Sequence, residues 1–246
     1  YKAGVVDRWV HSGYIAVIMQ NSRKQRYLPR SLTAAWLNAS DQFPVVLLTG
    51  PRQVGKTTLL QHLCEPQRQY VTLDDPTLRA LAREDPALFL QRFEPPLLID
   101  EIQYAPQLLS LVKVAVDANR RTGSFWLTGS QQFQMMKGVS ETLAGRVAIL
   151  NLLGFSRRER HHLPLEVPPF LPTQSRLAAR QGAGPLPALA AVYQEMWTGG
   201  FPALVAGPVK DRDLFYSSYL QTYLQRDVRD LARVGDETAF LRFLKA

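Results

Sequence analysis

The sequence Gly50-Pro51-Arg52-Gln53-Val54-Gly55-Lys56-Thr57 matches the phosphate-binding loop pattern G-x-x-x-x-G-K-[ST]. Residues 45–49, directly before it, form the short apolar run typical of a buried parallel strand. Residues 58–63, directly after it, are typical of the first turns of a helix. In this context the loop amides can surround an anion while the helix dipole attracts it. The stretch therefore predicts a polyphosphate-binding site.

Two side chains of this loop have separate predicted roles. We expect Lys56 to contact the β- and γ-phosphates of a nucleotide and the Thr57 hydroxyl to bind Mg²⁺. The alternative is an ordinary glycine turn between a strand and a helix, which a second motif makes less favourable. The predicted nucleotide-binding residues are Gly50, Pro51, Arg52, Gln53, Val54, Gly55, Lys56, Thr57 and Thr58.

The second motif is residues 96–101, an apolar strand that ends in Asp100 and Glu101, which is the Walker B pattern. A carboxylate at the C-terminal end of a parallel strand lies beside the phosphate loop, so we predict that Asp100 binds Mg²⁺ with Thr57. Glu101 is placed to orient and polarise the attacking water, as a general base must. Either motif alone is a weaker signal than the pair. Together they predict a nucleotide polyphosphate and Mg²⁺ as the ligands of this site.

The strand predicted at residues 124–128 ends in Gly129-Ser130-Gln131. In additional-strand P-loop ATPases a polar residue at this position contacts the γ-phosphate or the lytic water. Ser130 is our candidate, with Thr128 and Gln131 close behind. The alternative for Ser130 is an ordinary helix N-cap.

Arg146 directly precedes the last predicted strand and is the candidate for a positive charge on the transferred phosphoryl group. It would act either in cis or from a neighbouring subunit, which leaves a homo-oligomer open as a partner. An ordinary surface arginine is the alternative. The predicted catalytic residues are Lys56, Glu101, Ser130 and Arg146.

Five predicted strands alternate with helices, which predicts a three-layer α/β core with a parallel five-stranded sheet. With the phosphate loop and the acidic strand end, this core resembles P-loop proteins of the additional-strand, AAA- or RecA-like type. Leu32, Trp36 and Leu37 of a first helix over residues 31–39 are expected to pack against this core. Asp74 and Asp75 are expected to cap the next helix, with proximity to the Mg²⁺ site as the alternative. The predicted strands are 45–49, 70–73, 96–100, 125–128 and 147–151, and the later helices 77–93 and 106–119.

Four regions follow from the composition along the chain. Residues 1–26 are predicted to be a poorly ordered N-terminal extension, 27–155 the ATPase core, 156–190 a Pro-rich linker, and 191–246 the helical start of a C-terminal domain. A long helix is expected from about residue 211 to 233. Its aromatic spacing favours a packing face over a base-stacking platform. The residues of that face are Tyr216, Tyr219, Leu220 and Tyr223.

The overall composition excludes several classes of protein. With 46% hydrophobic and 20% charged residues, the chain is typical of a folded soluble protein. One cysteine excludes an internal disulfide and favours a cytoplasmic location, and no apolar run approaches the roughly 20 residues of a membrane span. The net charge of +8 permits nucleic acid as a partner, but the basic residues form separate clusters, so solvated surface is the favoured interpretation. The clusters are Arg23, Lys24, Arg26 and Arg30; Arg120 and Arg121; Arg157, Arg158 and Arg160; and Arg226, Arg229 and Arg233.

Together these segments resemble the prokaryotic AAA-like ATPases that carry a C-terminal domain of unknown function. The likeness rests on residues 48–58, 73–76, 99–103, 127–131 and 143–146, and continues through 199–202 and 219–227. It implies ATP and Mg²⁺ binding, with ATP hydrolysis expected. In that family the chain normally continues through winged-helix-like and nuclease-like regions, whose DNA-binding or nuclease properties are not carried over to this chain.

The leading functional hypothesis is an Mg²⁺-dependent ATPase that acts as a switch or motor module. The alternative is a nucleotide-dependent regulatory protein with little turnover, which holds DNA or a partner with its basic surface. A GTPase would need an Asn-Lys-x-Asp motif, which the sequence lacks. A helicase would need a second motor domain, for which there is no room.

Overall fold

The structure is a computed structural model, and it describes residues 27–129, 138–139, 141–165, 171–180, 187–207 and 209–223. The predicted N-terminal extension, residues 1–26, lies outside the described residues. In chain order the elements are α2 (Thr33–Gln42), β1 (Val45–Thr49), α3 (Lys56–Leu63), β2 (Gln69–Thr72), α4 (Pro76–Glu84), α5 (Pro86–Arg92), β3 (Leu97–Asp100), the 3-10 helix η1 (Ile102–Tyr104), α6 (Leu108–Ala118), β4 (Phe125–Thr128), β5 (Val147–Asn151), α8 (Arg157–Arg160), α9 (Gln174–Arg180), α10 (Leu189–Thr198), α11 (Pro202–Val205) and α12 (Arg212–Tyr223). Within the described part of the chain, no helix combines the length and apolar character that crossing a bilayer requires.

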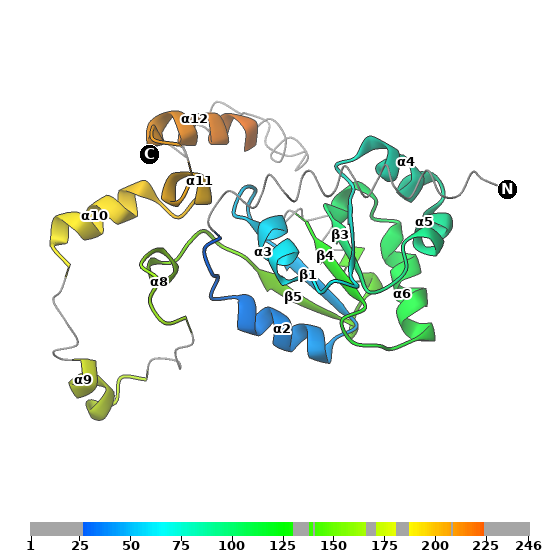
Figure 1. Ribbon diagram of the computed structural model, residues 1–246, viewed down its shortest axis with the longest axis horizontal. Helices are drawn as coiled ribbons and strands as arrows, with labels where there is room; N and C mark the ends of the chain where they lie inside the picture. Colours follow the sequence, from blue (N-terminus) through cyan, green and yellow to red (C-terminus); the bar gives the residue numbers. More distant parts are fainter. Residues whose placement is uncertain are drawn as a thin grey trace.

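The five strands form one parallel sheet in the order β2-β3-β4-β1-β5 (Figure 1). β4 lies between β1, which leads into the phosphate loop, and β3, which ends in the acidic pair. This order confirms the predicted additional-strand arrangement. Because the strands are parallel, their C-terminal ends meet at one edge of the sheet. The predicted motifs follow β1, β3 and β4 at that edge.

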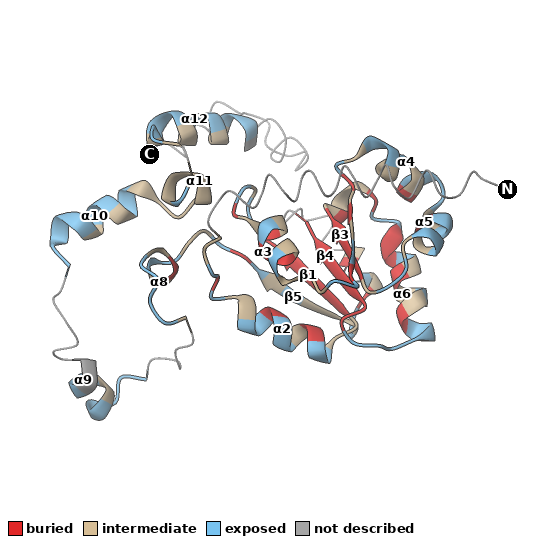
Figure 2. Cartoon of the chain, in the orientation of Figure 1, coloured by how far each residue is buried: buried red, intermediate tan, exposed pale blue. Residues whose placement is uncertain are grey.

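The sheet is covered on both faces, so β1 is buried along its whole length (Figure 2). Successive side chains of a strand point to opposite faces. Val45 and Leu47 join the core that includes α4, α5 and α6, whereas Val46 and Leu48 join the core that includes α2 and α3. Burial on two faces explains why β1 is a continuous apolar run rather than an alternating one.

Trp36 is the central contact between α2 and the sheet. Its side chain is fully buried and meets Trp126 of β4 edge to face, with ring centroids 5.3 Å apart. Leu32 is partly buried against the same core, as predicted. The prediction for Leu37 is wrong, since 42% of this residue is exposed. One helix position after Trp36, the side chain is turned about 100° away from the buried face.

The predicted helical stretch 77–93 is two helices, each started by an aspartate and a proline. Asp75 accepts hydrogen bonds from the backbone N–H groups of Thr77 at 2.7 Å and Leu78 at 3.2 Å, which confirms its role as an N-cap. Asp85 ends α4 and caps α5 by accepting from Leu88 N–H at 2.9 Å.

The chain after β5 differs from the predicted linker. Ser156 and Glu159 form a capping box that starts α8, and Glu159 is only 5% exposed. Among the first residues of the predicted linker, Glu159 is therefore buried, whereas Ser156 and Arg157 are exposed. Further along, Phe201 packs against Tyr216 and Tyr219 of α12, with ring centroids 5.8 and 4.8 Å away. These contacts confirm a packing face for the two tyrosines.

Candidate functional site

The loop after β1 has backbone angles that require its glycines. Gly50 has φ +143°, and a Cβ atom there would lie 2.2 Å from the backbone oxygen of Leu152. Gly55 has φ +92° at the N-cap of α3. L-residues with a side chain rarely adopt such angles. The two glycines therefore allow the loop to turn tightly between β1 and α3.

Lys56 is the first residue of α3, and its side chain returns to the loop. The ammonium donates to the backbone oxygens of Gly50 at 3.0 Å and Pro51 at 2.9 Å, and the residue is 6% exposed. The first-turn N–H groups of a helix have no acceptor within the helix. A buried ammonium beside such a helix start is suited to bind an anion.

Thr57 and Asp100 meet across the edge of the sheet. The Thr57 hydroxyl donates to both carboxylate oxygens of Asp100, at 3.1 and 3.0 Å. The structure therefore brings together the two residues predicted to bind Mg²⁺. A hydroxyl and a carboxylate fit this ion, which is usually held by one or two protein oxygens, waters and substrate phosphates. Among the described residues there is no group of three or more His, Cys, Asp and Glu that could hold a metal by itself.

Two further hydroxyl groups orient the Asp100 carboxylate. Tyr70 of β2 donates to one oxygen at 3.2 Å, and Thr128 at the end of β4 donates to the other. Burial, and secondarily the neighbouring carboxylate, raise the pKa of Tyr70, so its phenol keeps the proton that it donates. Asp100, itself 4% exposed, is thus fixed from β2, β4 and α3.

Glu101 is held by its backbone and by its side chain. It has φ +60°, a left-handed conformation that persists only where the surroundings impose it. Its N–H donates to the Thr128 hydroxyl at 3.2 Å, and the Gln103 amide donates to its carboxylate. Thr128 therefore connects the two acids of the second motif.

We expect Thr128→Val to destabilise the protein by about 1–3 kcal/mol, because a buried carboxylate and a backbone N–H lose one partner each. Thr128 is fully buried, so water cannot replace the hydroxyl without a rearrangement. Urea unfolding measures the stability loss. Thr128→Ser keeps the hydroxyl and should recover most of it, whereas equal unfolding curves for wild type and Thr128→Val would contradict the bridging role.

The other predicted contacts with the γ-phosphate have different outcomes. Ser130 and Gln131 lie outside the described residues, so both stay predictions. Thr128, the third candidate for this contact, donates to the Asp100 carboxylate and accepts from the Glu101 N–H. Arg146 lies at the N-terminal ends of the strands, opposite to the phosphate loop, since its backbone oxygen accepts from Val45 N–H at the start of β1.

The side chain of Arg146 is paired with Asp117 of α6 through two hydrogen bonds, at 2.6 and 3.0 Å. The length of β1, about 16 Å for its five residues, separates it from Gly50. This placement does not fit a contact with a phosphate held by the same chain. Action on a neighbouring subunit stays a prediction.

Family models match two parts of the chain, one in the predicted ATPase core and one at the C-terminal end. Residues 42–161 match a family described as an AAA domain, and residues 189–246 match a domain of unknown function (DUF8612). Residues 42–161 are an AAA domain. This agrees with the resemblance found in the motifs and supports nucleotide binding at the loop after β1. The match extends past residue 155 and includes α8.

Two curated relatives are uncharacterized mycobacterial proteins, Rv2008c of Mycobacterium tuberculosis and Mb2031c of Mycobacterium bovis. Each is 30% identical to this chain over 204 residues, which cover 82% of the chain and 40% of the relative. The chain thus spans about two fifths of the length of these relatives.

Solved structures similar to the chain include AMPPCP-bound DnaA from Aquifex aeolicus, with a TM-score of 0.43, 14% identity, and 81% of this chain and 63% of that chain covered. RuvB from Thermotoga maritima matches with a TM-score of 0.33 and 23% identity, over 54% of this chain and 45% of that chain.

Several residues around the AAA domain's site were not predicted from the sequence. Tyr70 and Gln103 lie next to predicted motifs, but no sequence pattern assigns them a contact with Asp100 or Glu101. Arg30 was assigned to a solvated basic cluster, yet it is 4% exposed and pairs with the buried Glu159. The one signal for Glu159 is local, because Ser156 and Glu159 have the spacing of a capping box.

Proposed function

We propose that this protein binds ATP together with Mg²⁺ and hydrolyses the γ-phosphate, and that it acts as a switch or motor module. The observation that carries the proposal is the contact between Thr57 and Asp100 at 3.0 Å, in the first turn of the helix that begins at Lys56. An AAA domain over residues 42–161 further supports it. The location of this contact at the carboxyl edge of a parallel sheet is typical of nucleotide sites.

Each residue of the site has a defined task in this proposal. The loop amides, the start of α3 and the Lys56 ammonium stabilise the negative charge on the phosphates. Thr57 and Asp100 would hold Mg²⁺, which would supply charge neutralisation at the phosphate oxygens when bound. Glu101 orients the attacking water and accepts its proton.

The test is a series of turnover measurements on the purified chain. We expect phosphate release from ATP to exceed release from GTP, and to stop when EDTA removes Mg²⁺. Nucleotide binding without turnover under all conditions would contradict the hydrolase proposal. Absence of any ATP binding would contradict the whole assignment.

A second candidate function is a nucleotide-dependent regulatory protein with little turnover. It is favoured by the hydrogen bond from Gln103 to the Glu101 carboxylate, since a carboxylate engaged by a neighbour is less available to an attacking water. The net charge of +8 is compatible with DNA as the partner. Adding DNA to the turnover series separates the candidates: ATP-dependent, salt-sensitive DNA binding with background hydrolysis would favour this second function.

A further inference from the structure

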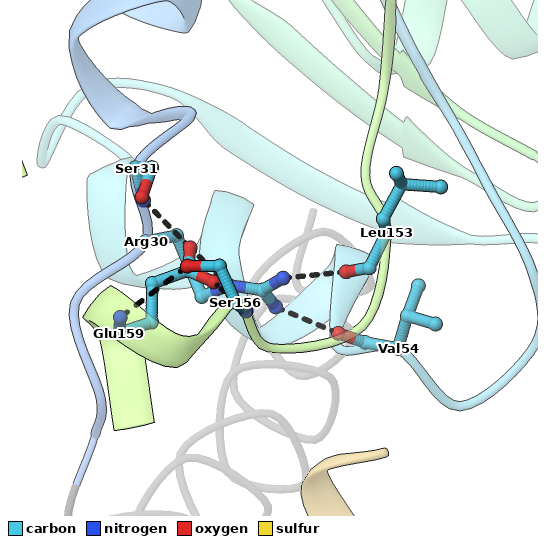
Figure 3. A network of polar contacts seen from close by, with 6 residues as sticks. All are labelled: Arg30, Ser31, Val54, Leu153, Ser156 and Glu159. Atoms are coloured by element: carbon cyan, nitrogen blue, oxygen red, sulfur yellow. Dashed lines mark hydrogen bonds and ion pairs between the residues drawn. The ribbon is translucent and has the colours of Figure 1, made fainter. Parts of the chain in front are cut away.

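Arg30, a buried arginine shortly before α2 in the sequence, contacts the phosphate loop at Val54 (Figure 3). Arg30 is 4% exposed, and its guanidinium has partners on three sides. Nε pairs with Glu159 at 3.1 Å, Nη1 donates to the backbone oxygen of Val54 at 2.9 Å, and Nη2 donates to that of Leu153 at 2.5 Å. The planar group thus joins the loop, the chain after β5 and α8. Of these partners, Val54 belongs to the predicted nucleotide-binding loop, whereas Leu153 and Glu159 had no predicted role in the site.

The partner carboxylate is itself fixed in place. Glu159 accepts from the N–H groups of Ser31 at 2.7 Å and Ser156 at 2.6 Å (Figure 3). Burial alone would raise the pKa of Glu159, but these two N–H groups and the charge of Arg30 outweigh it and lower the pKa. The carboxylate is therefore ionised near neutral pH, and it holds Arg30 in one orientation.

The contact with Val54 determines how the next amide points. The only cis peptide among the described residues joins Pro95 and Pro96, so the peptide between Val54 and Gly55 is trans. In a planar trans peptide the C=O and the N–H point in opposite directions. Because Arg30 holds the Val54 oxygen on its own side, the Gly55 N–H points away from Arg30. An amide directed away from Arg30 is left available to an anion held by the loop.

The same guanidinium also lies against Phe155, the last residue of the predicted core, which in turn contacts the C-terminal region. It is 4.4 Å from the ring centroid of Phe155, whose N–H donates to the Gly200 oxygen at 2.6 Å. A Cβ atom at Gly55 would lie 3.9 Å from Pro202, the first residue of α11. Residues of both regions thus lie near the Val54–Gly55 peptide, and rotating this peptide would break its hydrogen bond with Arg30.

We propose that Arg30, oriented by Glu159, is a positioning residue of the nucleotide site that fixes the Gly55 amide for contact with phosphate. This rests on the proposed function, because it assumes that the loop binds a nucleoside triphosphate. Arg30 does not touch the reacting atoms. Its loss should therefore weaken nucleotide binding far more than it slows turnover of the bound nucleotide.

Arg30→Lys is the sharpest variant, because it keeps the charge but cannot supply three directed donors from one plane. We expect the Kd of a fluorescent ATP analogue to rise about tenfold, the loss of roughly one oriented hydrogen bond. The kcat at saturating ATP should stay within about twofold of the wild type.

Arg68 is the matched control, a second buried arginine away from the loop. It is 8% exposed, pairs with Glu65 at 2.7 Å and donates to the backbone oxygen of Gly123 at 2.9 Å. Its guanidinium also lies 3.8 Å from the ring centroid of Trp126. Arg68→Lys should lower the melting temperature and leave the Kd of the nucleotide unchanged. This separates the loss of a buried guanidinium from the loss of this particular contact.

The outcomes are distinct. If the wild type binds the analogue and Arg30→Lys binds it equally well, or if Arg68→Lys weakens binding as much, the positioning role is overturned while the proposed function stands. If the wild type does not bind ATP, both are overturned. Should Arg30→Lys fail to fold, Glu159→Gln replaces it: a higher Kd with unchanged kcat supports the inference, and an unchanged Kd overturns it.

Discussion

We expect the Glu101→Gln variant to bind ATP as tightly as the wild type and to hydrolyse it at least about a hundredfold more slowly. Glutamine has the size and shape of glutamate but cannot accept the proton of an attacking water. The left-handed backbone at this position is held by the Thr128 hydroxyl, which the substitution does not touch. Single-turnover hydrolysis measures the rate, and titration with a fluorescent ATP analogue measures the affinity.

Glu94→Gln is the matched control for this variant. It removes the same charge from an exposed position just before the opposite end of β3. Both its turnover and its affinity should equal those of the wild type. Unchanged turnover in Glu101→Gln would show that another group activates the water. A large loss of affinity in Glu101→Gln would instead assign the residue to binding.

The central contact of the site followed from the sequence because it depends on topology. A loop after one parallel strand and an acid after another must meet at the same edge of the sheet. Only the order of the strands was needed to place Thr57 beside Asp100. The same rule places Arg146 at the N-terminal ends of the strands, because Arg146 precedes β5 while the phosphate loop follows β1. The sequence thus contained the information against a contact in cis.

The supporting contacts depend on details that no local pattern contains. Tyr70 reaches Asp100 because β2 and β3 pair with Thr72 opposite Asp100, a register that the sequence does not determine. Arg30 and Glu159 are 129 positions apart, and each looks like one charged residue of a polar segment. Their burial results from how α8 folds back onto the chain before α2. Tertiary contacts of this kind are recognised only in the three-dimensional structure.

We expect Lys56→Met to abolish measurable ATP turnover and to weaken nucleotide binding at least about a hundredfold, because one charged donor to the phosphates is lost. Methionine matches the length of the apolar part of lysine, so the change isolates the ammonium. The backbone oxygens of Gly50 and Pro51 lose their donor, so the loop itself should also become less rigid. Isothermal titration with ATP and Mg²⁺ measures the affinity.

Lys113→Met provides the comparison, because it removes the same group from α6, on the far face of the sheet from α3 (Figure 1). That variant should bind and hydrolyse ATP like the wild type. If Lys56→Met kept its affinity while its circular dichroism matched the wild type, the loop would not hold phosphate through this ammonium. The proposed roles of Thr57 and Asp100 would then lose their main support, because both are argued from a nucleotide placed beside Lys56.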